Sequence, residues 1–129
     1  MKGQILLIED NEQNRYLTKF LLEKNGYAVH TASDGAMGVE MAGQILPDLI
    51  LLDIQLPTMD GYAVAQGLRQ NAALAATPIV AVTSYAMTGD REKAMGAGCD
   101  GYIEKPINPA TFADEVGRYL KDGRGKDKP

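Results

Sequence analysis

The sequence of 129 residues contains one cysteine and one histidine, and it has no long hydrophobic run. Cys99 cannot form a disulfide within the chain, so a reducing cytoplasm is the compartment that fits best. A membrane span is not expected, because no stretch of about 18 apolar residues is present. The first residues lead directly into a strand-like run, without the apolar segment of a signal peptide.

Basic residues are also few. The 13 Lys and Arg are outnumbered by 17 Asp and Glu, which gives a net charge of −4. Surfaces that bind nucleic acid normally carry an excess of positive charge, so this balance argues against such a function. A Walker A motif is absent. The segment Gly96–Gly101 fits the pattern G-x-G-x-x-G, but it closes a predicted helix and opens a strand, the reverse of what a dinucleotide site requires.

What the chain does contain is a regular alternation of strand-like and helical segments. Its length and its 45% hydrophobic content are those of one globular domain. The expected strands are Ile5–Ile8, Tyr27–Ala32, Leu49–Asp53, Pro78–Thr83 and Gly101–Glu104. The expected helices are Gln13–Lys24, Gly35–Ile45, Gly61–Asn71, Gly89–Gly96 and Pro109–Lys121. Five such units predict a parallel sheet with helices on both faces.

Local signals refine these elements. Asp34 and Asp60 precede helical segments as N-caps. The apolar positions Leu17, Phe20 and Leu21 predict the face of the first helix, and Phe112, Val116 and Leu120 predict that of the last. The second strand alternates large and small residues and should lie at an edge of the sheet. The domain is expected to cover residues 1–121, followed by a flexible polar tail or linker stub at 122–129.

Polar side chains stand at the C-terminal ends of four predicted strands. Asp53 closes the apolar run Leu49–Leu52, which reads as a strand buried on both faces. The other strand ends carry Glu9, Asp10, Thr83 and Lys105. Open parallel sheets bind their ligands at this edge. We therefore expect a site with three carboxylates, one hydroxyl and one ammonium group.

Three carboxylates in one cleft repel one another unless a cation compensates them. Oxygen ligands suit Mg²⁺, or Mn²⁺. Asp10 and Asp53 are expected to bind the metal directly, and Glu9 directly or through water. The backbone carbonyl of Gln55, just past the strand end, is a further candidate ligand.

The candidate nucleophile is also a carboxylate. Ser84 has no evident base, because the single histidine, His30, lies on the predicted edge strand. Carboxylates form aspartyl phosphates in some proteins. The residues thus predict that Asp53 accepts a phosphoryl group in the presence of Mg²⁺, while Thr83 and Lys105 contact the phosphoryl oxygens.

Four segments carry a resemblance to a known family. They are Ile8–Asn11, Asp53–Gly61, Ala81–Ser84 and Tyr102–Pro106. In this order and at these separations, they resemble the response-regulator receiver domain of bacterial two-component signalling. The resemblance covers Gln4 to about Leu120, and the segments 57–61 and 82–87 are most similar to stand-alone receivers of the DivK kind. The family more often has two aspartates where this chain has Glu9 and Asp10.

The resemblance implies a flavodoxin-like (βα)5 fold, doubly wound, with strand order 2-1-3-4-5. It implies that Asp53 is the phospho-acceptor and Lys105 the phosphate-contacting cation, with Glu9 and Asp10 as the metal-binding acids. Thr83 and Tyr102 would be the switch hydroxyl and the switch aromatic residue. The peptide bond before Pro106 would be cis. Such a domain is a signalling module and not an enzyme in the usual sense, because it catalyses only its own phosphorylation and dephosphorylation.

The resemblance also implies partners. The phosphoryl donor would be a sensor histidine kinase or a histidine phosphotransfer protein. A downstream protein would bind the face formed by the fourth helix, fifth strand and fifth helix, at about 87–94, 102–104 and 110–117. From their positions, Gln55, two residues past Asp53, and Tyr85, two residues past Thr83, are expected to flank the phosphoryl group and tune its lifetime, with the Tyr85 ring restricting the attacking water.

Three other classes of protein fit the residues less well. A dehalogenase-like phosphatase typically has a second aspartate two residues after the nucleophile, where this chain has Gln55. A flavodoxin-like cofactor carrier needs a Ser/Thr/Gly-rich loop after the first strand, where this chain has Glu9–Glu12. A receiver-like protein that works without phosphorylation is disfavoured, since each expected site residue is present.

Overall fold

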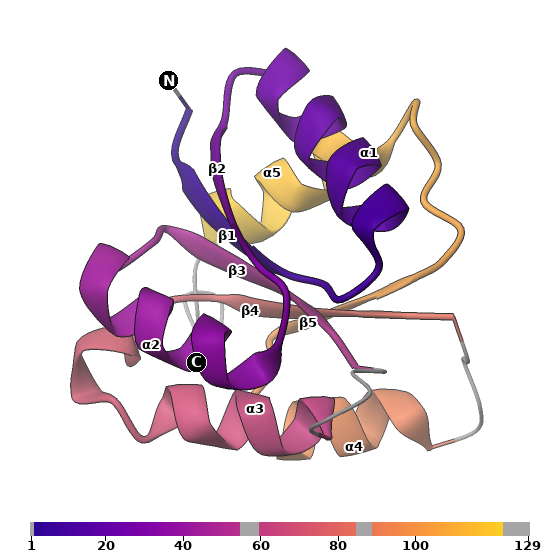
Figure 1. Cartoon of the computed structure of the whole chain (residues 1–129). Coiled ribbons are helices and arrows are strands. Elements are labelled where there is room, and N and C mark those ends of the chain that lie inside the picture. The colour runs from indigo at the N-terminus through magenta and orange to yellow at the C-terminus, as the bar shows by residue number, and fades with distance from the viewer. Residues whose placement is uncertain (1, 55–59, 85–88, 123–129) are drawn as a thin grey trace.

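The computed structural model describes residues 2–54, 60–84 and 89–122 (Figure 1). Its centre is a five-stranded parallel sheet in the order β2-β1-β3-β4-β5. The strands are β1 (Gln4–Ile8), β2 (Ala28–Ala32), β3 (Leu49–Asp53), β4 (Ile79–Thr83) and β5 (Gly101–Glu104). The flavodoxin-like fold and strand order expected from the family are confirmed.

Helices cover both faces of the sheet. They are α1 (Glu12–Lys24), α2 (Gly35–Ile45), α3 (Gly61–Arg69), α4 (Asp90–Gly96) and α5 (Phe112–Asp122), with a short 3-10 helix, η1 (Ala72–Leu74), before β4. Figure 1 shows α1 and α5 on one face and α2, α3 and α4 on the other. Each face therefore has a hydrophobic core of its own.

The position of each strand in the sheet explains its sequence. All residues of β3 and β4 are buried, because both strands are covered by helices on both faces. Strand β2 lies at the edge and is only partly buried, as its alternating pattern predicts. The central strand β3 thus holds Asp53 at the end of a rigid, fully buried segment.

The predicted caps of two helices are present. The Asp34 side chain accepts a hydrogen bond from the Met37 amide at 2.8 Å, and Asp60 accepts one from the Tyr62 amide at 2.9 Å. Each satisfies an amide group that has no partner within its helix. The Gly96–Gly101 segment ends α4 and begins β5, with Gly98 at φ +111°, so its interpretation as a helix stop is confirmed.

Several details of the prediction were wrong. In α1 the fully buried residues are Thr18 and Leu22, while Leu17 and Phe20 remain 47% and 50% exposed. The buried side of the helix is therefore rotated relative to its most apolar stripe, and of the three predicted residues only Leu21 packs against the core. Helix α5 begins at Phe112 and not at Pro109, because the Asn108 carbonyl and side chain first close a turn with the amides that follow.

Other boundaries shift by one or two residues. Helix α3 ends at Arg69, before the expected Asn71, and the side chain of Asn71 caps the following η1. Helix α5 extends to Asp122, one residue past the expected domain end. The rest of the expected tail, residues 123–129, lies outside the described residues.

Arg69, the last residue of α3, joins the connection that leads to β4 with the connection between α4 and β5, at the edge of the sheet opposite to the acidic residues. Its guanidinium forms an ion pair with Asp100 at 2.6 Å and donates to the carbonyl of Gly98 at 2.9 Å. It also donates to the carbonyls of Leu74 and Thr77 at 2.9 and 2.7 Å. Both charged side chains are only about one-eighth exposed, at 12% and 13%.

We expect Arg69→Ala to lower the free energy of unfolding by about 3 kcal/mol, because it leaves Asp100 partly buried without this cation. Urea unfolding measures the change. The matched control is Arg118→Ala, which removes an exposed arginine from α5 and should change stability by less than about 0.5 kcal/mol. Equal effects of the two substitutions would contradict the role assigned to Arg69.

Candidate functional site

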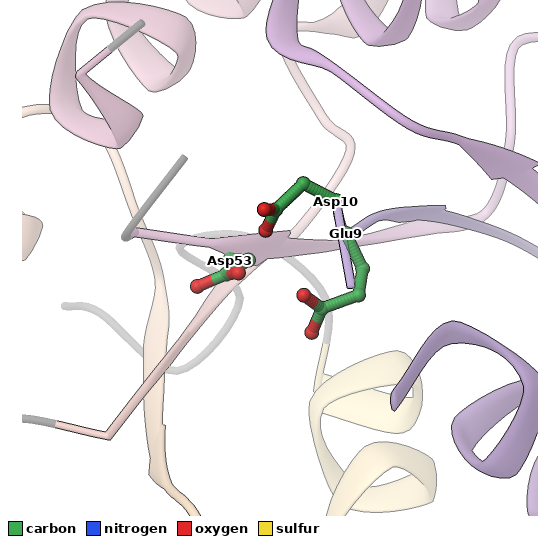
Figure 2. Close-up of side chains that lie close together, drawn as sticks. All are labelled: Glu9, Asp10 and Asp53. Carbon is green, nitrogen blue, oxygen red and sulfur yellow. The ribbon is translucent and has the colours of Figure 1, made fainter. Parts of the chain in front are cut away.

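Three carboxylates meet at the C-terminal edge of the sheet. Glu9 and Asp10 directly follow β1, and Asp53 is the last residue of the adjacent β3, where Ile8 pairs with Leu52. Figure 2 shows the three side chains directed toward one another. One oxygen of each carboxylate lies within 4.8 Å of the others. The parallel register is what brings residues more than forty positions apart into this acidic cluster.

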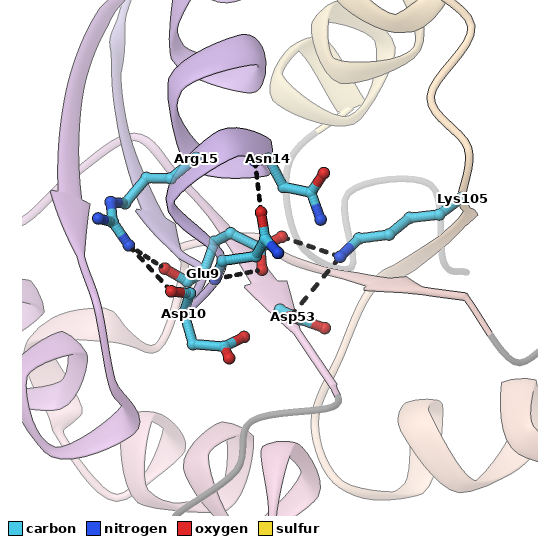
Figure 3. A network of polar contacts seen from close by, with 7 residues as sticks. Glu9, Asp10, Asn14, Arg15, Asp53 and Lys105 are labelled. Carbon is cyan, nitrogen blue, oxygen red and sulfur yellow. Dashed lines mark hydrogen bonds and ion pairs between the residues drawn. The ribbon is translucent and has the colours of Figure 1, made fainter.

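Lys105 reaches the acidic cluster from the loop after β5 (Figure 3). Its Nζ lies 2.9 Å from Glu9 Oε1 and 3.6 Å from Asp53 Oδ2. The peptide bond between Lys105 and Pro106 is cis, the geometry that the family resemblance implies. One ammonium group therefore faces two of the three carboxylates.

Burial gives the carboxylates different properties. Glu9 and Asp53 are buried, with 3% and 4% exposure, whereas Asp10 is exposed to solvent. Burial, together with the neighbouring Asp53, raises the pKa of Glu9 to about 7, although Lys105 acts in the opposite direction. Near neutral pH, Glu9 therefore carries a proton in a substantial fraction of molecules when no other cation is bound.

Thr83 and Tyr102 lie on β4 and β5, the two strands beyond β3 in the sheet. Thr83 ends β4, is buried and pairs in register with Glu104. The ring of Tyr102 packs against the core formed by α2, α3 and α4. Its hydroxyl is buried, and within the part of the chain that the structure describes it has no hydrogen-bond partner. Burial is also the first cause of the raised pKa of Tyr102.

Two of the expected site residues cannot be placed. Gln55, the candidate carbonyl ligand, and Tyr85, the second candidate for tuning, lie outside the described residues. Residues 87 and 88 of the expected output face are outside them as well. Their roles stay predictions.

Two residues of the site were missed by sequence reasoning. Asn11 caps α1 by accepting from the Asn14 amide at 2.9 Å, and its own amide donates to Glu9 Oε2 at 3.2 Å. The guanidinium of Arg15 donates to the backbone carbonyls of Glu9 and Asp10 at 2.9 and 3.3 Å. Asn11 could have been recognised as a typical N-cap before a helical segment. Arg15 carried no such signal, because its partners are main-chain atoms.

The donor set suits a hard divalent cation. Three carboxylates at this separation offer oxygen ligands of the kind that Mg²⁺ prefers, and the exposure of Asp10 leaves the cluster open to water. Among the residues that the structure describes, the cluster includes no soft ligand, and Cys99 is buried in the core on the side of α2, α3 and α4. The residues present therefore fit Mg²⁺ or Mn²⁺.

Comparison with known proteins decides the family. Residues 5–116 match the response regulator receiver domain. The chain belongs to this family. It is 38% identical over 122 residues to the polar-differentiation response regulator DivK of Brucella anthropi, covering 95% of this chain and 99% of that protein. The homologue of the same name from Brucella abortus matches to the same extent.

Solved structures place the receiver domain among CheY-like proteins. The chemotaxis protein CheY4 of Vibrio cholerae superposes with a TM-score of 0.86 at 27% identity, covering 90% of this chain and 97% of that one. The receiver domain of a sensor histidine kinase from Pseudomonas aeruginosa superposes with a TM-score of 0.85 at 34% identity, covering 92% and 98%. That neighbour has a magnesium ion coordinated in its active site cleft.

The chain is thus a DivK-like receiver domain of a two-component response regulator, with an acidic cluster that can hold a metal ion. Histidine kinases or phosphotransfer proteins are the partners that membership implies. Among the described residues, no helix is both long and apolar enough to cross a bilayer.

Proposed function

We propose that this receiver domain accepts a phosphoryl group on Asp53 from a phosphohistidine protein and signals by phosphorylation-dependent binding of a partner protein. The observation that carries the proposal is the position of Asp53. It is a buried carboxylate that ends the central strand of the sheet, and it faces Lys105 at 3.6 Å. The sheet thus fixes the position of the acceptor, and the cluster is open to solvent on the side of Asp10, from which the phosphoryl donor could approach.

In this reaction an Asp53 carboxylate oxygen attacks the phosphorus atom. The bond between phosphorus and the donor nitrogen breaks, and its electron pair leaves with the imidazole. The Lys105 ammonium would neutralise charge on the phosphoryl oxygens, and the Thr83 hydroxyl would donate a hydrogen bond to one of them. Glu9, Asp10 and Asp53 would hold Mg²⁺, which supplies further neutralisation of the transferring group when bound. We place the reaction in the cytoplasm, which suits the free cysteine.

Incubation with acetyl phosphate and Mg²⁺ tests the proposal without a partner protein. Intact-mass measurement should show one added phosphoryl group, which hydroxylamine removes because acyl phosphates react with it. Acetyl phosphate tests the acceptor chemistry directly, so a negative result would not reflect a wrong choice of kinase. Unmodified protein under conditions that saturate the metal site would refute the proposed function.

We expect Mg²⁺ to raise the melting temperature, because it relieves repulsion within the acidic cluster and binds the folded state alone. Asp10→Asn should weaken this shift by removing an exposed ligand without disturbing the core. Asp48→Asn, at the opposite end of β3, is the control and should leave the shift unchanged. A wild-type protein that shows no shift at saturating Mg²⁺ would contradict the metal site.

The stability of the protein and its response to Mg²⁺ should both depend on pH through Glu9, whose pKa is raised to about 7 in the folded protein. Without metal, the free energy of unfolding should fall as pH rises from about 5 to about 8, since the folded state binds the extra proton. The Mg²⁺-dependent shift should grow over the same range, because the metal and the proton compete for Glu9. Glu9→Gln should flatten both trends, and a shift that grows toward low pH would contradict this coupling.

The output face is proposed to be α4, β5 and α5. The phosphoryl group would draw the Thr83 hydroxyl toward Asp53 through a charge-assisted hydrogen bond. This movement would vacate space beside β4. Tyr102 lies on the next strand, with its ring packed against the core, and would fill that space by changing its rotamer. A partner that prefers one orientation shifts the equilibrium toward it.

Beryllofluoride with Mg²⁺, a stable substitute for the phosphoryl group, should change the NMR shifts of β5 and of the nearby faces of α4 and α5. Coupling of this kind is typically about 1–3 kcal/mol, so partner affinity should change by about ten- to a hundredfold. Tyr102→Ala should reduce the distant changes while leaving those around Asp53 intact. Shift changes confined to the loops around Asp53 would refute this output face.

A further inference from the structure

The loop that carries the acidic pair lies outside the regular hydrogen bonding of the sheet. Strand β1 ends at Ile8, so Glu9 and Asp10 depend on other contacts to fix their direction. The Glu9 amide donates to the Ala32 carbonyl at 3.0 Å, which fixes one side of this loop. The carbonyl groups of both acids point the other way, toward α1.

Arg15 holds those two carbonyl groups. One terminal nitrogen, Nη1, donates to the carbonyl oxygens of both Glu9 and Asp10, at 2.9 and 3.3 Å. Figure 3 shows the guanidinium on one side of the loop and the Asp10 carboxylate directed away from it, toward Asp53. The ion pairs of the acidic cluster are made instead by Lys105, with Glu9 and Asp53. Arg15 thus contacts the main chain of the acids and leaves their carboxylates available.

The position of Arg15 is itself fixed by the start of α1. Its amide donates to the Asn11 carbonyl at 2.9 Å, and the Asn11 side chain caps the helix. The Asn11 amide in turn donates to Glu9 Oε2 at 3.2 Å. The loop is therefore closed by a short ring of hydrogen bonds in which the first turn of α1 holds both the main chain and one carboxylate.

We propose that Arg15 is a positioning residue for metal binding: by holding the main chain of Glu9 and Asp10, it keeps their carboxylates directed at the cation. This inference rests on the proposed role of the acidic cluster as the Mg²⁺ site. Outer contacts that orient metal ligands commonly change affinity by about 10- to 100-fold when removed. Because Arg15 acts on the main chain, we expect a loss near the lower limit, about tenfold.

A purely electrostatic role makes the opposite prediction. Arg15 is a cation in the first turn of α1, next to the loop that carries Glu9 and Asp10, so removing its charge alone should strengthen Mg²⁺ binding. Positioning should instead be lost even when the charge is kept, since the lysine side chain is one atom shorter and its ammonium group falls short of the place from which Arg15 Nη1 donates to both carbonyls. The sign of the change in Mg²⁺ affinity therefore separates the two roles.

The experiment measures the Mg²⁺ dissociation constant of the full chain by NMR titration, for wild type, Arg15→Ala and Arg15→Lys. The control is Lys19→Gln, which removes a positive charge one turn further along α1, where Lys19 lines a surface hollow with Tyr16, Phe20 and Glu23. We expect about tenfold weaker binding for Arg15→Ala and clearly weaker binding for Arg15→Lys. Lys19→Gln should bind as wild type or slightly more tightly.

A second readout separates positioning from general stability. Phosphorylation of Arg15→Ala by acetyl phosphate should be slow at low Mg²⁺ and should recover to near the wild-type rate at saturating Mg²⁺. Unchanged or tighter Mg²⁺ binding in Arg15→Ala, or wild-type binding in Arg15→Lys, would overturn the proposal, as would a melting temperature lowered without any change in affinity. If wild type itself bound no Mg²⁺, the proposed function would fail first.

Discussion

Asp53→Asn should abolish phosphorylation by acetyl phosphate, with no added mass under conditions that fully modify the wild type. The reason is chemical: an amide oxygen is a poor nucleophile toward phosphorus, and no other carboxylate takes the same place at the end of β3 beside Lys105. The variant should still fold, because it removes one of two buried carboxylates that repel each other. Its melting temperature without Mg²⁺ should be no lower than that of the wild type.

Asp60→Asn is the matched control for this substitution. Asp60 is an exposed carboxylate near the same edge of the sheet, where it caps α3 by accepting from the Tyr62 amide. Asparagine caps helices about as well as aspartate, so stability and phosphorylation should both be retained. Full modification of Asp53→Asn would show that another residue is the acceptor.

Lys105→Met should change metal binding and phosphorylation in opposite directions. Phosphorylation should slow by about a hundredfold, the usual effect of removing one group that neutralises developing charge in a transition state. Mg²⁺ should bind more tightly, since Lys105 at 2.9 Å from Glu9 and 3.6 Å from Asp53 competes with the metal for the same oxygens. The measurements are the rate of mass gain with acetyl phosphate and the Mg²⁺ dissociation constant.

Lys24→Met provides the comparison, because it removes an exposed ammonium group at the far end of α1. It should leave both quantities close to those of the wild type. If Lys105→Met weakened Mg²⁺ binding, Lys105 would act by holding Glu9 in place and not by competing with the metal. An unchanged phosphorylation rate would remove Lys105 from the proposed reaction.

The details that sequence reasoning missed share a physical cause. The most apolar stripe of α1 includes Leu17 and Phe20, yet the buried residues of the helix are Thr18 and Leu22. Apolar spacing measures the tendency of a face to be buried, but the fit against neighbouring strands decides which side turns inward. Similarly, Pro109 is suited to a helix start, but the turn made by Asn108 delays α5 until Phe112.

The order of elements, the buried central strands and the polar residues at the strand ends could be predicted from the residue pattern alone. A continuous apolar run such as Leu49–Leu52 predicts a buried parallel strand, and a carboxylate directly after it, as at Asp53, must then lie at the C-terminal edge of the sheet. Tertiary structure decided how the charges are shared. Lys105 bridges Glu9 and Asp53, burial raises the pKa of Glu9 to about 7, and Arg15 holds the main chain of the acidic pair. These properties depend on distances between residues far apart in the chain, and on main-chain acceptors that every residue possesses, so no residue pattern encodes them.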